Sequence, residues 1–167
     1  MPKLDDTASA GQTSGDMAEQ DSEYLTFSLE REEYAVPIMR VKEIRAWEPV
    51  TRVPHAQSWE CGLVNVRGAI VPIIDLRKRI GLKTHDYDKH TVVIMFNVRE
   101  LGREKIQGVV VDELTDVVRF PISSIQPAPQ LKKRKSTQFA QGVVEYSGRM
   151  IIMLDLVKAL GIREEAE

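Results

Sequence analysis

The second half of the chain repeats the first, and this duplication limits the possible folds more than any other feature. A shift of 80 residues places segment 62–82 on segment 142–162, and a shift of 73 places 41–44 on 114–117. The difference between these two shifts implies that the second copy has a longer loop, around Pro127 to Thr137. Identical pairs are Gly62/Gly142, Val64/Val144, Gly68/Gly148, Asp75/Asp155, Leu76/Leu156, Lys78/Lys158 and Gly81/Gly161. Because glycines and caps stay in register, we predict two copies of one structural unit.

Each copy is predicted to hold about five short β-strands. Apolar and polar residues alternate from Tyr24 to Leu29, and a turn then leads into a second strand, Tyr34 to Ile38. Two further strands, Leu63 to Val66 and Ala69 to Ile74, flank a turn at Arg67-Gly68. Short, evenly spaced strands favour small closed barrels, because closure removes unpaired strand edges. Barrels this small are filled by their own side chains, so we expect the binding surface in the groove between two of them.

Short helices complete the predicted unit. The spacing of Ile38, Val41 and Ile44 predicts two helical turns after the first hairpin. Asp75 to Ile80 is typical of a short helix that an Asp caps and Gly81 ends. The predicted class is therefore mostly β, with short helices that include one at the C-terminal end.

Composition divides the chain into a body and two tails. In residues 1–22, Lys3 is outnumbered by acidic residues, and almost nothing is apolar, so we predict a disordered acidic tail. Residues 23–162 form the predicted folded domain, and 163–167 a short C-terminal tail. The sequence shows no secretion leader and no apolar run near the ~20 residues of a membrane helix. A single cysteine, Cys61, cannot form an internal disulfide and fits a cytoplasmic protein. Because no apolar run is long enough, we expect no direct membrane insertion.

Catalytic and metal signals are weak. His85 and His90 flank acidic residues in a polar connector, which is more typical of a solvated loop than of a metal site. Cys61 begins a strand and fits a small buried thiol better than a nucleophile. We expect no enzyme activity, metal or cofactor. The basic run Lys132 to Lys135 could contact nucleic acid through phosphates, but few aromatic residues accompany it, and a solvated loop fits it better.

Arg67 and Glu43 form the most informative pair of charged residues. Arg67 lies at a tight turn that would project its guanidinium, and Glu43 falls on the predicted short helix that would cover the same barrel. An arginine–carboxylate pair there could fix a surface for a partner, whereas an exposed ion pair without a partner is equally compatible with the sequence.

Together these motifs resemble the bacterial chemotaxis coupling family CheW. The resemblance spans about residues 23–162. It is carried by segments 33–38, 41–45, 50–53, 62–77, 91–94, 108–112, 125–129 and 149–160, among them Asn65-Val66-Arg67-Gly68 and Asp75-Leu76-Arg77. It implies two intertwined SH3-like five-stranded barrels packed around a shared core.

The resemblance also implies a function. Members are non-catalytic adaptors that couple the cytoplasmic tip of a methyl-accepting chemoreceptor to the regulatory domain of the histidine kinase CheA. They are recruited from the cytoplasm to receptor arrays, where self-association in rings is possible. The residues that match the family's receptor- and kinase-binding positions are Val41, Glu43, Arg67, Gly108, Leu114 and Val117. Two alternatives are a coupling protein of a parallel chemosensory or surface-motility pathway, and a nucleic-acid-binding barrel that uses Lys132 to Lys135.

Overall fold

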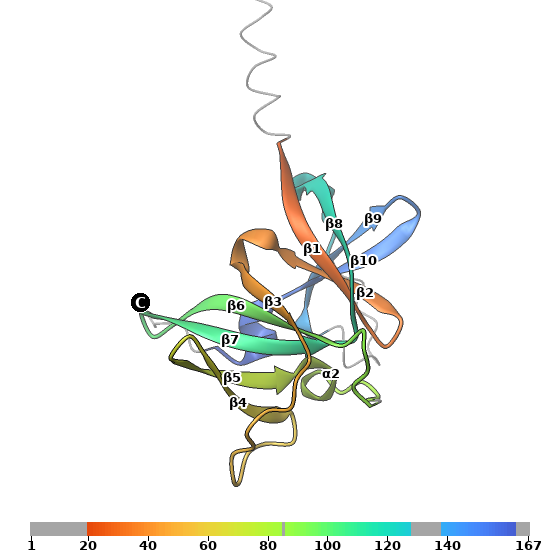
Figure 1. Cartoon of the computed structure of the whole chain (residues 1–167). Coiled ribbons are helices and arrows are strands. Elements are labelled where there is room, and N and C mark those ends of the chain that lie inside the picture. The colour runs from red at the N-terminus through yellow and green to blue at the C-terminus, as the bar shows by residue number, and fades with distance from the viewer. Residues whose placement is uncertain (1–19, 85, 128–137, 163–167) are drawn as a thin grey trace, which may run out of the picture.

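Two five-stranded sheets lie against each other in the computed structural model, which describes residues 20–84, 86–127 and 138–162 (Figure 1). The first half of the chain forms β1 (Asp21–Leu29), β2 (Glu32–Pro37), η1 (Ile38–Arg40), β3 (Val41–Ala46), β4 (Glu60–Val66), β5 (Ala69–Asp75) and α2 (Leu76–Arg79). The second half forms β6 (Val92–Glu100), β7 (Arg103–Val111), β8 (Glu113–Pro121), η2 (Ile122–Ser124), β9 (Ala140–Tyr146), β10 (Arg149–Leu154) and α3 (Leu156–Leu160). The mostly β class with short helices, one of them near the C-terminus, is confirmed.

The two copies of the repeat exchange strands. Sheet A has the order β8-β1-β2-β10-β9, and sheet B has the order β3-β6-β7-β5-β4. Replacing each strand by its repeat equivalent turns one order into the other. Each sheet thus combines a two-stranded hairpin from one half with three strands from the other. The expectation that one copy makes one barrel is corrected, whereas the intertwining of two barrels is confirmed.

Three hydrophobic cores follow from this exchange. Barrel A encloses Tyr24, Ala35, Val118, Phe120, Val144, Ile151 and Met153. Barrel B encloses Val66, Val71, Ile73, Val93, Met95 and Val110. A larger shared core lies between the barrels and contains Leu25, Phe27, Leu29, Leu76, Ile94, Phe96 and Val98. Both faces of β1 and β6 are therefore covered, and alternate residues of each strand enter different cores, as period-two geometry requires.

The structure explains why glycine occupies two of the repeat-related pairs of positions. A Cβ on Gly62 would lie 2.1 Å from the Thr51 carbonyl oxygen, and one on Gly142 would lie 2.5 Å from the Gln126 carbonyl oxygen. At both places the preceding loop pairs with the strand and helps to close the barrel. Gly68 and Gly148 occupy equivalent hairpin turns, where Arg67 and Ser147 also have positive φ angles.

The helix predicted from Ile38 onward is wrong. Only residues 38–40 form a 3₁₀ turn, and β3 follows at Val41 as an edge strand paired with β6. The strand has a register shift between Val41 and Glu43. Such a bulge adds one residue, so Val41 and Ile44, three apart, can still lie on the same face of the strand. Pairing with β6 overrides the local pattern, so Glu43 lies on a strand and Ile44 is 40% exposed.

The predicted caps are confirmed. The Asp75 carboxylate accepts a hydrogen bond from the N–H of Arg77 at the start of α2, and the Asp155 carboxylate accepts one from the N–H of Lys158 at the start of α3. β1 already begins at Asp21. Residues 1–19 and 163–167 lie outside the described residues, so the predicted tails stay predictions. Among the residues that are described, no helix is long and apolar enough to cross a membrane.

Candidate partner-binding site

Glu43 and Arg67 meet on the surface of sheet B. The Arg67 guanidinium donates two hydrogen bonds to the Glu43 carboxylate, with Nη2–Oε1 at 3.1 Å and Nη1–Oε2 at 3.3 Å. Arg67 can reach across because its turn, Arg67-Gly68, joins β4 to β5 and directs the residue outward with its side chain 69% exposed. The contact expected from the sequence is present, although Glu43 comes from a strand rather than a helix.

Arg45 adds a second guanidinium to this carboxylate. Residues 43 and 45 share one side of β3 because they are two apart, and Arg45 Nε lies 3.1 Å from Glu43 Oε1. The hydrogen bond from Arg45, followed by that from Arg67, lowers the pKa of Glu43 against the opposing effect of desolvation. The arrangement presents one fixed carboxylate between two arginines, a pattern that suits a polar partner surface. Sequence reasoning gave Arg45 no role in this pairing, although it lies in the motif that was singled out.

A small cavity of about 260 Å³ lies beside Arg45, between residues of sheet B and the loop that follows β3. Its lining includes Arg45, Leu63, Asn65, Ile73 and Val93. The cavity is therefore lined by both polar and apolar side chains.

Gly108 packs against Ile73 and Val93, two residues that line this cavity. It is buried in β7, and an added Cβ would lie 2.2 Å from Ile73 Cδ1 and 3.2 Å from Val93 Cγ1. The equivalent position of sheet A carries Ala35, which pairs with Met153 as Gly108 pairs with Ile73. Gly108 thus acts through packing, by keeping Ile73 and Val93 in place, and its own atoms are not offered to a partner.

Of the other three predicted residues, Val41 and Leu114 are equivalent by the repeat. Val41 on β3 and Leu114 on β8 are both half-buried against the shared core. Val117 on β8 is 46% exposed and is the repeat equivalent of Ile44. The six predicted residues therefore do not form one cluster: Val41, Glu43, Arg67 and Gly108 belong to sheet B, while Leu114 and Val117 belong to sheet A.

Exposed apolar side chains extend both groups. Ile70 follows the Arg67-Gly68 turn in sheet B, and Met150 follows the equivalent turn in sheet A, with 62% and 59% exposure. Sheet B thus exposes Ile44 and Ile70, and sheet A exposes their repeat equivalents Val117 and Met150. Alternation alone could not identify them, because it does not say which face of a strand is covered.

The remaining candidates contribute little chemistry. Cys61 is half-buried on β4, and its Sγ lies 3.6 Å from the Tyr87 hydroxyl; burial raises the pKa of this thiol. His90 lies 3.7 Å from Glu113, and within the described ranges no group of three or more His, Cys, Asp and Glu could hold a metal. His85 and Lys132 to Lys135 lie outside the described residues.

Comparison with known proteins decides the family. Residues 23–164 match the family model described as CheW-like domain. The chain belongs to the CheW-like family. "Probable chemotaxis protein CheW" of Rhizobium etli is 37% identical over 88% of this chain and 92% of its own length. "Chemotaxis protein CheW" of Klebsiella aerogenes is 37% identical over 94% of this chain and 89% of its own length.

A solved structure agrees with this assignment. The crystal structure of the scaffolding protein TtCheW from Thermoanaerobacter tengcongensis matches with a TM-score of 0.70 and 30% sequence identity. The match covers 80% of this chain and 88% of that one. The resemblance drawn from the motifs and the two-barrel fold are confirmed, and the function is that of a chemotaxis adaptor.

Proposed function

We propose that this CheW-like chain is a non-catalytic adaptor that binds the cytoplasmic tip of a methyl-accepting chemoreceptor and the regulatory domain of CheA. It acts in the cytoplasm and is recruited to membrane-associated receptor arrays. The observation that carries the proposal is the division of the candidate residues between two sheets, which offers two surfaces for two partners. Family membership supports the absence of catalysis, because the matched structure is named as a scaffold.

The two surfaces have the chemistry that protein partners require. A receptor helix is recognised by apolar anchors at helical spacing laid in a groove. A second apolar patch with a polar rim suits docking of a folded domain. Ile44 follows Glu43 and Ile70 lies three residues after Arg67, so the sheet B surface combines exposed apolar residues with an ion pair. Val117 and Met150 provide exposed apolar residues on sheet A.

We assign the residues to this function as follows. Glu43 and Arg67 fix the polar rim of the sheet B surface, and Gly108 keeps its cavity open. Val41 and Leu114 hold the edge strands β3 and β8 on the shared core, and Val117 contacts a partner directly. The signal passes as a coupling free energy between the two bound partners, so no bond chemistry is needed.

The test is a charge reversal at the pair. In the Arg67→Glu variant two carboxylates face each other on the surface, so we expect co-sedimentation with receptor-containing membranes and CheA to fall about tenfold or more in affinity, the range of an interface hot spot. Thermal unfolding should change little, because the pair is exposed.

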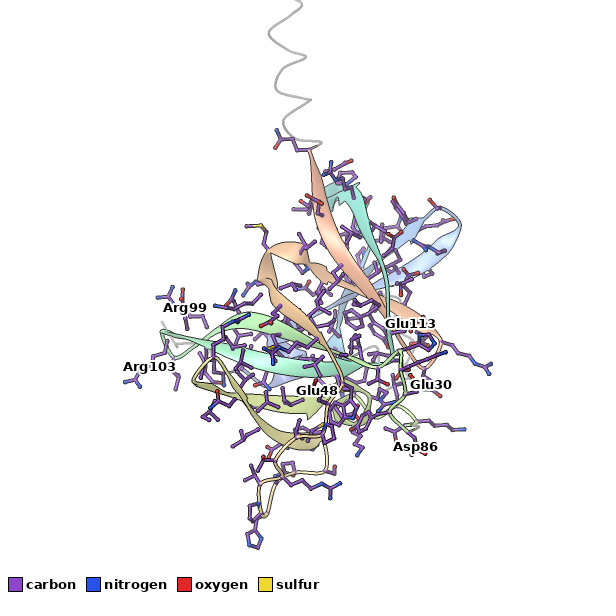
Figure 2. All side chains as sticks on the ribbon, in the orientation of Figure 1. Glu30, Glu48, Asp86, Arg99, Arg103 and Glu113 are labelled. Carbon is purple, nitrogen blue, oxygen red and sulfur yellow. The ribbon has the colours of Figure 1, made fainter. Side chains whose placement is uncertain are left out.

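Lys89→Glu is the matched control. Lys89 is exposed and lies in the connector between α2 and β6, and the substitution changes the charge by the same amount. The same connector carries Asp86, and Figure 2 shows Asp86 on the opposite side of the molecule from Arg99 and Arg103. Arg99 and Arg103 lie at the β6–β7 turn. Because β5 and β7 pair in parallel, the β4–β5 turn with Arg67 lies at that same end of sheet B. Wild-type affinity of the Arg67→Glu protein in a receptor–CheA ternary complex would show that Arg67 has no binding role.

A further inference from the structure

A buried arginine joins two carboxylates at the end of sheet B. Arg77, in the first turn of α2, is 1% exposed, and Asp75 is fully buried. Arg77 Nε and Nη2 donate to Asp75 Oδ1 at 3.0 Å and Oδ2 at 2.9 Å, and Nη1 donates to Asp112 Oδ1 at 3.0 Å. The planar guanidinium therefore bridges the end of β5 and the junction between β7 and β8, which a lysine could not do with the same geometry.

Asp112 carries this connection into sheet A. Its Oδ2 accepts a hydrogen bond from the backbone N–H of Glu30 at 2.7 Å, and its own N–H donates to the Ser28 carbonyl oxygen at 3.1 Å. Ser28 and Glu30 belong to the end of β1 and to the β1–β2 turn. Glu30 and Glu113 line the same surface hollow, and Figure 2 shows both at this end of the molecule. The chain Asp75–Arg77–Asp112–Glu30 thus links the two sheets through side-chain contacts.

Tyr87 secures the other end of the chain. Its hydroxyl donates to Asp75 Oδ2 at 3.0 Å, and the Arg77 guanidinium lies 5.2 Å from its ring centre. Burial, with further contributions from Cys61 and Asp75, raises the pKa of the Tyr87 hydroxyl. The hydroxyl therefore remains a proton donor at physiological pH and holds Asp75 in place for Arg77.

The position of Asp112 relates this network to the candidate site. Asp112 is the single residue between β7, which carries Gly108, and β8, which carries Leu114 and Val117. A displacement of β8 against β7 must therefore pass through the residue that Arg77 holds.

We propose that Asp112, clamped by Arg77, is the joint that transmits partner binding on one sheet to the other. This inference rests on the proposed adaptor function. It makes Arg77 and Asp112 positioning residues, which set the relative orientation of the two binding surfaces without touching either partner.

Asp112→Asn tests the joint with little change in shape. An asparagine has one carbonyl oxygen, so it cannot accept from both Arg77 and the Glu30 N–H through separate oxygens. The measured quantity is the affinity of the full-length protein for a soluble receptor cytoplasmic fragment, with and without saturating CheA regulatory domain. The ratio of the two affinities is the coupling factor, which typically lies between about 5 and 150.

We expect Asp112→Asn to bind each partner alone within about twofold of wild type, as a variant away from the contact surfaces should. Its coupling factor should fall towards one. Arg77→Lys keeps the buried charge but loses the bridge, so it should lower the coupling factor too. Asp155→Asn is the matched control. Asp155 caps α3 as Asp75 caps α2, but the α3 residue equivalent to Arg77 is Val157, which carries no guanidinium. The coupling factor of Asp155→Asn should equal that of wild type.

The outcomes separate the joint from the adaptor function. If both Asp112→Asn and Arg77→Lys keep the coupling factor of the wild-type protein, the proposed role of Asp112 is wrong. It is also wrong if the wild-type protein itself binds both partners with a coupling factor of one. Equal losses of binary and ternary affinity also overturn it, because they indicate a structural role alone. A wild-type protein that binds neither partner overturns the adaptor function itself. If Asp112→Asn does not fold, Arg77→Lys decides.

Discussion

The two capped helices, α2 and α3, show how a duplicated backbone acquires different chemistry. Each follows an equivalent hairpin, and each is capped by an aspartate and followed by a glycine with a positive φ angle. In α2 the second helical residue is the buried Arg77, whereas in α3 it is the half-buried Val157. Among the described residues, Asp75 accordingly takes part in a buried ion network and Asp155 does not.

The same contrast appears at the hairpin turns. Arg67 in the first copy pairs with Glu43, whereas its equivalent in the second copy is Ser147, and the equivalent of Glu43 is Asp116, which accepts a hydrogen bond from the N–H of Val117. Backbone requirements are shared by both copies, because turns and caps allow few residue types. Charged side chains can diverge without loss of the fold, and they are where the two sheets acquire different roles.

The largest expected effect comes from making α2 resemble α3. Arg77→Val should lower the free energy of unfolding by about 3–5 kcal/mol, because it leaves the buried Asp75 carboxylate without its cation. Denaturant unfolding measures this change. Asp155→Asn, a change to the aspartate that caps α3, should stay within about 0.5 kcal/mol of wild type. Equal stability of Arg77→Val and wild type would mean that the network does not distinguish the two helices.

The double variant Asp75→Asn with Arg77→Val sharpens this result. It removes both opposite charges, so much of the loss should be recovered. If the double variant is no more stable than Arg77→Val, the cost lies in lost packing rather than in an uncompensated charge.

A smaller effect is expected where the two barrels close. Gly62→Ala and Gly142→Ala should each cost about 1–3 kcal/mol, because the added Cβ meets a carbonyl oxygen of the pairing loop. Gly62→Ala should be the more costly, because Gly62 also has a φ of +147°. Thermal unfolding of the two variants side by side checks the order, and the reverse order would contradict this account of the closures.

The smallest effect concerns the titration of Glu43. Carbon-detected NMR should show the Glu43 carboxyl titrating below its ordinary range, and removal of either guanidinium should raise its pKa. Arg45→Ala should raise the pKa more than Arg67→Ser, which gives the turn the residue of the second copy, because the hydrogen bond from Arg45 is the larger cause of the shift. The ion pair is therefore intact above this lowered pKa and is lost as the pH falls through it. A Glu43 pKa that neither variant moves would contradict the pairing.

The sequence predicted the repeat, the hairpins, the capped helices and the Glu43–Arg67 contact, because each depends on residues with few structural alternatives. It did not predict β3, because the spacing of Ile38, Val41 and Ile44 fits a helix as well as a bulged strand, and only pairing with β6 distinguishes them. The motif that contains Arg77 indicates the family but does not predict a buried ion network. Its partner Asp112 is 35 residues away, and no local pattern relates the two.

The sequence by itself determined where the chain turns, where the capped helices begin and end, and which family the chain resembles. These features depend on glycines, capping residues and motifs that are local in the sequence. The tertiary structure decided which half of the chain supplies each strand of a barrel and which charges become buried partners. Strand exchange and the Arg77–Asp112 bridge depend on contacts between distant residues, and such contacts gain their free energy only once both sheets have formed and excluded water between them.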